Sequence, residues 1–456
     1  DPGPAAARPD QRAMRFPTGP GGWARVLVEL REQVDTGELI RRAREEELGR
    51  AEARRRALAA LEEVAARGAA RLRPLLDALV ETGRADYYRA LRFRNRIFVS
   101  VRPEAVPELV AHPDVARVIP EYDSVREARR RRGGTGSAVG APRPVPPGDS
   151  WAVAALGLPA LWRRGIDGRG VRIGLLDTGV MGDHAALAPA RAPGPSWHDP
   201  VNGSPRPVDT RGHGSEVLGC ALARPLDGRA LGAAPGAVWV AALANLHNSY
   251  NNVNMSLAAD WLLFEGRPDV VLGAWGHGAG SCDDRDLPMI EAFRAAGALP
   301  VFAAGNDGPG PRTGQAPAAL AGLAPDGRRP LSVAAVDQRL EVIEPSSRGP
   351  SPCGGNEPFP DLAAPGWDLP VPAGPDPKGL RLEAGTSMAV GWVGGVAALV
   401  FQVAPDLRVD EVEEILRRTA RDLPPAGPDP ASGFGLVDPA AAVSEARRVA
   451  KRRRGR

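Results

Sequence analysis

Three polar side chains of this chain have neighbours that would let them carry out nucleophilic catalysis. Asp177 ends the apolar run Val171–Leu176, His213 has a glycine on either side, and Ser387 stands where an apolar helix is expected to begin. A carboxylate can orient an imidazole, and the imidazole can then take the proton of a serine hydroxyl. The three residues therefore predict acyl transfer through a covalent Ser387 intermediate, with Asp177 and His213 activating the hydroxyl.

A fourth residue, Asn306, would stabilise the charge that such a reaction develops. It follows the apolar run 299–304 and precedes Asp-Gly-Pro, so we expect it at the carboxyl end of a strand. A side-chain amide there can donate a hydrogen bond to the oxyanion, which is often the largest contribution to catalysis of acyl transfer. Taken singly, each of the four residues also has a structural explanation, as a turn or helix-cap residue. Their occurrence together, in the order Asp, His, Ser, favours catalysis.

Two other kinds of catalytic residue are disfavoured. A second Asp-Thr-Gly occurs at Asp35, and such segments are typical of aspartic proteases, in which two carboxylates share one proton. Asp35, however, begins a charged helical segment and does not end an apolar strand. Cys220 lies about 10 Å beyond His213 along the predicted helix, at about 1.5 Å per residue, and is not expected to share its chemistry.

The segment 151–448 is predicted to position the four residues. Short apolar runs without polar alternation recur in it, at 171–176, 238–243, 270–273, 299–304 and 331–336. Continuous apolar strands indicate a parallel sheet that helices cover on both faces. We therefore predict an α/β fold with a doubly wound, mostly parallel sheet, whose active-site residues gather at the carboxyl ends of the strands.

Residues 23–125 predict a separate and smaller α+β domain. The expected elements are a strand over 24–30, a long helical segment over 38–79 that Pro74 kinks or splits, one or two strands within 87–101, a short helix over 103–111 and a strand over 115–122. This order predicts a sheet with helices on one side only.

Three further segments lack the composition of a packed core. Residues 1–22, rich in Pro, Gly, Ala and Arg, predict a disordered leader. Residues 126–150 contain the basic run Arg129–Arg132 followed by glycines and prolines, and predict an exposed linker with a processing site. Residues 449–456 form a basic tail that we expect to be solvated, because no aromatic residues are interleaved for nucleic-acid binding.

The overall composition limits the classes of partner that we expect for this chain. Of the 456 residues, 43% are hydrophobic, which allows a sizeable core. A net charge of +3, from 58 basic and 55 acidic residues, argues against nucleic acid as a partner. No apolar run reaches the roughly 18–20 residues of a membrane span. The 3 cysteines have no metal-binding spacing and leave at least one thiol free; a Cys282–Cys353 bridge and unpaired thiols both stay open.

Four segments resemble the hallmark segments of the subtilases, a family of serine peptidases. They are LLDTGV around Asp177, GHGSEVLG around His213, AAGNDGP around Asn306 and GTSMA around Ser387. The resemblance extends over nearly all of residues 151–445. It implies a subtilisin-like fold in which Asp177, His213 and Ser387 are the catalytic triad and Asn306 is the oxyanion donor.

The same resemblance implies an activity and a set of partners. Residues 23–123 resemble the long propeptide of the bacillopeptidase F branch, in which a helical insertion extends the inhibitory module. We therefore expect a secreted serine endopeptidase that acts on proteins and peptides. It would be made as a zymogen, inhibited by its own propeptide until self-processing, and its signal peptide would already be removed. A monomer without a membrane span or a nucleic-acid partner is expected.

The family also implies a substrate groove and leaves room for a metal ion. An extended peptide would pair with Leu272, Gly273, Ala274, Trp275, Gly276, Ala303, Ala304 and Gly305. No cofactor is required for the chemistry. Structural calcium is common in subtilases, and the loop 223–232 lies where one such site falls, with Asp227 as the obvious ligand.

Several residues depart from the family pattern. Gly391-Trp392 stands where Pro-His is usual, Glu216 replaces a second histidine, and Gly273-Ala274 replaces Asn-Ser. The triad is untouched, but the preferred substrate stays open. The alternative function is therefore a weakly active or non-catalytic binding protein on the same scaffold.

Overall fold

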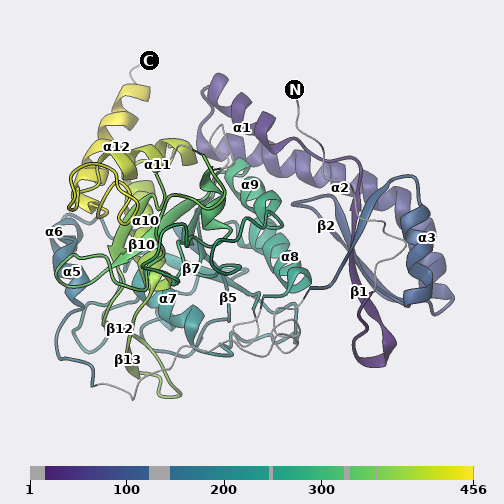
Figure 1. Ribbon diagram of the computed structural model, residues 1–456, viewed down its shortest axis with the longest axis horizontal. Helices are drawn as coiled ribbons and strands as arrows, with labels where there is room; N and C mark the ends of the chain where they lie inside the picture. Colours follow the sequence, from purple (N-terminus) through teal and green to yellow (C-terminus); the bar gives the residue numbers. More distant parts are fainter. Residues whose placement is uncertain (1–15, 123–143, 246–249, 323–328, 356–357, 455–456) are drawn as a thin grey trace.

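The structure is a computed structural model that describes residues 16–122, 144–245, 250–322, 329–355 and 358–454. Figure 1 shows two parts, a large α/β domain and a smaller N-terminal domain beside it. The predicted leader up to residue 15, and the predicted linker and processing region from 126 to 143, lie outside the described residues.

A seven-stranded parallel sheet forms the centre of the large domain, in the order β11-β10-β9-β8-β5-β7-β6. Its strands are β5 (Arg172–Asp177), β6 (Trp197–His198), β7 (Val238–Leu243), β8 (Val270–Gly273), β9 (Leu299–Ala303), β10 (Leu331–Val336) and β11 (Leu362–Pro365). The strands are apolar and almost wholly buried because helices cover both faces of the sheet. The predicted doubly wound parallel sheet is confirmed.

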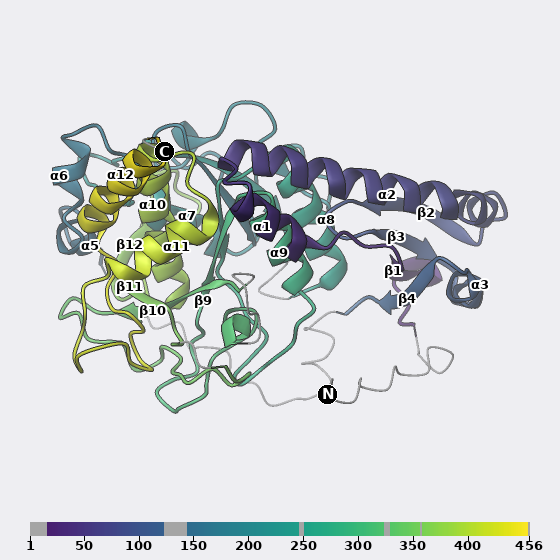
Figure 2. The same cartoon turned by 90° about the horizontal axis from the view of Figure 1, so that it is seen from above.

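Helices α7 and α10 lie on one face of the sheet, and α8 and α9 lie on the other (Figure 2). The helices of this domain are α5 (Trp151–Ala155), α6 (Leu158–Trp162), α7 (His213–Leu222), α8 (Asn252–Trp261), α9 (Leu287–Ala295), α10 (Thr386–Val403), α11 (Val409–Arg418) and α12 (Pro439–Arg454). A short antiparallel pair, β12 (Leu369–Pro372) and β13 (Leu380–Glu383), packs beside α7.

Gly391 allows α10 to lie directly against α7. A Cβ at this position would lie 2.5 Å from the carbonyl oxygen of Val217 and 2.7 Å from the Cβ of Cys220, so any side chain would push the two helices apart. The neighbouring Trp392 is fully buried in the core. The departure from the family pattern at 391–392 is thus accommodated by packing within the core, between α7 and α10.

Helix α10 has the length and apolar composition of a membrane-spanning helix, the one such case in the described parts of the chain. Its window of mean hydropathy 1.5 is 83% buried inside the protein, between α7 and the sheet. It therefore forms the centre of the fold, as a core helix does.

The N-terminal domain is a four-stranded antiparallel sheet, in the order β2-β3-β1-β4, crossed by helices. Its elements are β1 (Ala24–Leu30), α1 (Thr36–Glu45), α2 (Arg50–Glu81), β2 (Ala85–Leu91), β3 (Arg96–Val101), α3 (Val106–Ala111) and β4 (Val115–Pro120). Val26 and Val28 face α2, whereas Leu27 and Phe98 pack with residues of α8. The domain's own helices α2 and α3 lie on one face of its sheet, as predicted, and α8 of the large domain covers the other face.

The helical segment of this domain breaks at residues 46–49 and not at Pro74. Pro74 lies inside α2, on the exposed side. The carbonyl of Ala70, which loses its amide partner there, belongs to an exposed residue and can bond to water instead. The helix therefore continues for 32 residues across the proline.

Two terminal segments are more structured than predicted. Thr18 bridges to Ala24, and Phe16 packs on the core of the N-terminal domain, so residues 16–22 are not a disordered leader. The predicted basic tail continues α12 to Arg454, with 455–456 outside the described residues. Arg453 in it pairs with Glu411 at 2.8 Å and donates to the Glu47 carbonyl at 3.1 Å. This part of the tail contacts both domains.

Candidate active site

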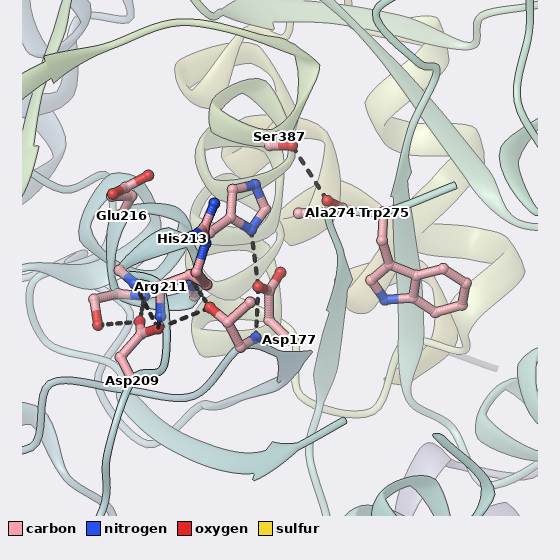
Figure 3. Close-up of polar contacts among 12 residues, drawn as sticks. Asp177, Asp209, Arg211, His213, Glu216, Ala274, Trp275 and Ser387 are labelled. Atoms are coloured by element: carbon pink, nitrogen blue, oxygen red, sulfur yellow. Dashed lines mark hydrogen bonds and ion pairs between the residues drawn. The ribbon is translucent and has the colours of Figure 1, made fainter. Parts of the chain in front are cut away.

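Asp177 and His213 are joined by a hydrogen bond at the carboxyl end of β5. The Oδ1 atom of Asp177 lies 2.8 Å from Nδ1 of His213 and also accepts the N–H of Thr178 at 2.7 Å (Figure 3). Because a buried carboxylate is an acceptor only, Nδ1 carries the imidazole proton and Nε2 is left free to take another. Gly179 lets the chain after Asp177 lie against Val208 and Asp209, since its φ is 115° and a Cβ would collide with the carbonyl of Val208.

Asp209, which the sequence reasoning missed, fixes the start of the helix that carries His213. Its carboxylate accepts the N–H groups of Gly212 at 2.7 Å and Ser215 at 2.9 Å, together with the hydroxyls of Thr178 at 2.8 Å and Ser215 at 2.7 Å. Thr178 in turn accepts the N–H of Gly214 at 3.0 Å. Asp209 lies three residues before the N-cap Gly212, so the usual helix-start signal of a polar residue at the N-cap does not mark it.

Ser387 lies in the first turn of α10 and is 8% exposed. Its hydroxyl donates to the carbonyl oxygen of Ala274 at 3.2 Å. Figure 3 shows the imidazole of His213 between Asp177 and Ser387, with its second nitrogen on the Ser387 side. No hydrogen bond joins Ser387 to His213 among the described residues, so the hydroxyl must turn from Ala274 to Nε2 before it can transfer a proton.

Asn306 lies beside the same helix start. Its Oδ1 atom accepts the N–H of Thr386 at 3.0 Å and the Thr386 hydroxyl at 3.1 Å. Because the amide oxygen is held by these donors, the NH₂ group of Asn306 is the part left to donate. The structure thus brings the four predicted residues to one edge of the sheet, from β5, α7, α10 and the end of β9.

The predicted groove residues divide into three sets. Leu272 and Gly273 are buried within β8, where Leu272 packs under α10 and cannot touch a substrate side chain. Ala274, Trp275 and Gly276 line a cavity of about 440 Å³ that Asp177 and His213 also line. Its full lining is Tyr122, Asp177, Thr178, His213, Asn245, Tyr250, Ala274, Trp275, Gly276, His277, Gly278, Asp283 and Arg285. Ala303, Ala304 and Gly305 lie at the end of β9, where Ala303 and Ala304 are buried.

A hydrogen-bonded cluster that the sequence did not reveal forms one wall of this cavity. Asp286 accepts the Tyr250 hydroxyl at 2.7 Å and lies 2.5 Å from Nε2 of His277. The Tyr250 ring packs 4.4 Å from that of His277 and 5.8 Å from that of Trp275. Tyr250 lies 36 positions from Asp286, and His277 and Asp286 are 9 positions apart with no helical or strand periodicity, so no local pattern could have grouped the three.

The charges around His213 favour its protonated form. Burial alone would lower the pKa of His213, but the Asp177 carboxylate outweighs it and, with Glu216 and Asp209, raises the pKa to about 9. Glu216 is itself buried, and its burial, partly opposed by Arg381, raises its pKa to about 7. The residue that replaces the family's second histidine therefore adds negative charge beside the proposed base.

The cysteines take no part in this site. Cys282 and Cys353 form a disulfide, which settles the alternative that the sequence left open. Cys220 is a free thiol, buried between α7 and α10, and burial raises its pKa far above the usual range. A thiol in that state is inert as a nucleophile.

Replacing Glu216 by glutamine should move the acid limb of the pH profile to lower pH. The substitution removes a negative charge that stabilises protonated His213, so the pKa of His213 should fall and neutral imidazole should be present at lower pH. The measurement is the rate of covalent labelling by a fluorophosphonate probe from pH 6 to 10, on processed protein.

Glu383→Gln is the matched control, because Glu383 contacts Arg381 at 2.8 Å without being among the groups that shift His213. If both variants have the wild-type midpoint, the effect of Glu216 on the base is disproved.

Replacing Asp209 by alanine should destabilise the protein and slow catalysis. The four donors described above and the N–H of Arg211, which lies 3.0 Å from Asp209 Oδ1, lose their acceptor. We expect the free energy of unfolding to fall by about 2 kcal/mol or more, together with a lower kcat/KM because the His213 helix start is loosened. Denaturant unfolding in a Ser387→Ala background and peptide hydrolysis by the active form measure the two effects.

Asp337→Ala is the control, since Asp337 also caps a turn but lies outside the site. Equal kcat/KM values for the two folded variants would contradict a positioning role for Asp209.

Comparison with known proteins agrees with this geometry. The subtilase family profile matches residues 168–435. Bacillopeptidase F of Bacillus subtilis (strain 168) is 31% identical over 415 residues, covering 81% of this chain and 27% of that protein. Serine protease AprX of the same organism is 28% identical over 277 residues, covering 55% of this chain and 61% of that protein. Subtilisin Savinase of Lederbergia lenta is 29% identical over 293 residues, covering 64% of this chain and 98% of that protein.

The chain spans less than two thirds of the length of the first two of these relatives. The family profile nevertheless covers more than half of the chain and includes Asp177, His213, Asn306 and Ser387. The chain therefore belongs to the subtilase family of serine peptidases.

Proposed function

We propose that this protein is a serine endopeptidase that hydrolyses peptide bonds in proteins through an acyl-enzyme. The observation that carries the proposal is the alignment of Asp177, His213 and Ser387 at one edge of the sheet, with the Asn306 amide beside them. In the proposed reaction, Ser387 Oγ attacks the scissile carbonyl carbon while its proton passes to Nε2 of His213. Asp177 stabilises the imidazolium that forms.

The oxyanion of the tetrahedral intermediate would be held by two kinds of donor. One is the NH₂ group of Asn306, whose oxygen is anchored by Thr386. The other is the backbone N–H of Ser387 in the first turn of α10, where N–H groups have no partner within the helix. His213 then gives its proton to the leaving amine, and a water molecule hydrolyses the acyl-enzyme with the proton returning to Ser387. No step needs a cofactor.

The N-terminal domain is proposed to be an inhibitory propeptide. Tyr122, at the end of β4, lines the cavity that contains Asp177 and His213. Its N–H donates to the Asn252 side chain at 2.7 Å, which holds the strand end on the start of α8. A substrate could not occupy that part of the cavity until the domain leaves, which supports a zymogen.

Charged contacts at places far from the cavity also hold this domain on the large domain. Arg50 pairs with the largely buried Asp269 at 2.5 Å, and Arg54 reaches the same carboxylate at 3.2 Å. Arg92 pairs with the buried Asp260 at 2.9 Å. These contacts would keep the domain bound after the linker is cut, so we propose that self-processing and release are separate events.

The proposed location is extracellular, and the proposed state is a monomer. The Cys282–Cys353 disulfide supports the location, because such bonds persist in oxidising compartments. The alternative, a non-catalytic binding protein on this scaffold, is favoured by one observation: the Ser387 hydroxyl is bonded to Ala274 and not to His213. Labelling of Ser387 by a fluorophosphonate probe would exclude that alternative.

The loop 223–232 does not fit a calcium site. Its Asp227 carboxylate pairs with the ammonium of Lys378 at 2.8 Å, and no group of three or more His, Cys, Asp or Glu side chains among the described residues could hold a metal ion. We therefore expect a chelator to leave the Tm of the Ser387→Ala protein unchanged. A lower Tm, restored by added calcium, would show that a calcium site exists outside this loop.

Self-processing is tested by the intact mass of wild type beside Ser387→Ala, both freshly expressed and incubated at neutral to alkaline pH. We expect wild type to be cut between Tyr122 and Trp151 and the variant to stay whole. If both are cut alike, another protease is responsible and self-processing is refuted. If both stay whole and the probe fails to label wild type, the peptidase assignment itself fails.

A further inference from the structure

The N-terminal domain is attached to the large domain at two opposite edges of the parallel sheet. At the carboxyl edge, Tyr122 lines the cavity of the proposed active site. At the amino edge, Arg50 and Arg54 of α2 bind the carboxylate of Asp269. The other oxygen of that carboxylate accepts the N–H of Arg172, the first residue of β5, at 2.9 Å. Since β5 spans about 17 Å at about 3.3 Å per residue, the helical attachment does not depend on what occupies the cavity.

Arg453, near the end of α12, binds both domains with one guanidinium group. Its Nη1 atom donates to the carbonyl of Asp406 at 3.1 Å and pairs with Glu411 at 2.8 Å, both in the large domain. Its Nη2 atom donates to the carbonyls of Glu47 at 3.1 Å and Leu48 at 3.2 Å, both in the N-terminal domain. The Arg453 and Glu411 side chains are 23% and 19% exposed, so water screens this contact less than a fully exposed one. The basic segment thus connects the turn between α1 and α2 to the region where α11 begins.

The backbone of the α1–α2 turn suits a cation with several donors. Carbonyl groups at the carboxyl end of a helix carry partial negative charge, and α1 ends at Glu45. Glu47 has a φ of 49°, a left-handed conformation that residues other than glycine rarely adopt. The N–H of Leu48 donates back to the carbonyl of Ala43 at 2.9 Å, which fixes this turn. Two successive carbonyls therefore meet one guanidinium group, whose fork of donors can bind both.

The helices on either side of this turn also contact the large domain there. The Nε atom of Arg44, in the last turn of α1, donates to the carboxylate of Asp410 at 2.8 Å. The Nε atom of Arg50, in the first turn of α2, donates to the carbonyl of Pro405 at 2.9 Å. Helix α1 lies beside α9 and the start of α11 (Figure 2). The turn is thus bound through both flanking helices as well as at its centre.

We propose that Arg453 is a latch that retains the N-terminal domain on the large domain after self-processing, by binding the α1–α2 turn. This inference rests on the proposed zymogen function, and it assigns a role to a basic segment whose composition predicts only solvation. Two attachments of one domain make each rebinding event intramolecular, so loss of one attachment speeds release without any change in the cavity. Release of the inhibitory domain is therefore controlled at the edge of the sheet opposite the catalytic residues.

The test compares the self-processed forms of wild type, Arg453→Ala and Arg452→Ala. Arg452 is exposed on the same helix, so Arg452→Ala removes an equal charge and is the matched control. Each protein is diluted once its intact mass shows that cutting of the linker is complete. The lag before peptide hydrolysis reaches its steady rate then measures release of the N-terminal domain. We expect Arg453→Ala to shorten this lag about tenfold, because hydrogen bonds from a charged donor are lost, and Arg452→Ala to leave it unchanged.

The steady rate that follows the lag separates retention from a general loss of structure. Per site labelled by a fluorophosphonate probe, this rate should be the same in all three proteins, because Arg453 lies outside the catalytic site. The inference is overturned if Arg453→Ala has the wild-type lag, or if Arg452→Ala shortens the lag equally. Wild type that stays uncut would instead refute self-processing, so the two failures are distinguishable.

Discussion

The hydrogen bond between Asp177 and His213 is the contact on which the whole site depends. It takes a charged carboxylate out of water, and the second oxygen of Asp177 has no hydrogen-bond partner among the described residues. Such a buried charge is costly unless a positive charge forms beside it. Burying the negative charge of Asp177 is unfavourable in isolation. The same buried charge therefore stabilises the imidazolium of His213. Much of the surrounding structure serves to keep these two groups together although they are 36 positions apart in the sequence.

Their alignment relies on close backbone approaches as much as on side chains. Gly179 and Gly214 lie where any Cβ would collide with neighbouring backbone, and Gly391 does the same between α7 and α10. Asp209 then anchors the first turn of α7 through backbone and hydroxyl donors. The histidine helix and the serine helix are thus set relative to the sheet by packing that tolerates no added atoms.

Sequence patterns predicted the elements whose signals are local. The parallel strands appeared as uninterrupted apolar runs, and Asp177, His213 and Asn306 were recognisable from the strand or glycines next to them. Contacts between distant residues left no such trace: the cluster of Tyr250, His277 and Asp286 is held by tertiary structure alone. The predicted kink or break at Pro74 was wrong for a different reason. A proline on the solvent side of a long helix leaves the carbonyl four residues earlier without its amide partner, and water can bond to that carbonyl instead. The groove prediction was too broad, since Leu272 belongs to a buried strand.

The Cys282–Cys353 disulfide closes a covalent ring of about seventy residues around part of the site. The ring contains α9, β9, Asn306 and β10, and hence the amide that would hold the oxyanion. At high concentration, the molecules of a protease can cleave one another. A single cut of the backbone within this ring would not release a fragment. The two ends would stay tethered and the strands would stay paired in the sheet. The disulfide would therefore let the part of the site that contains Asn306 tolerate self-digestion. Reduction of the disulfide would remove this tolerance.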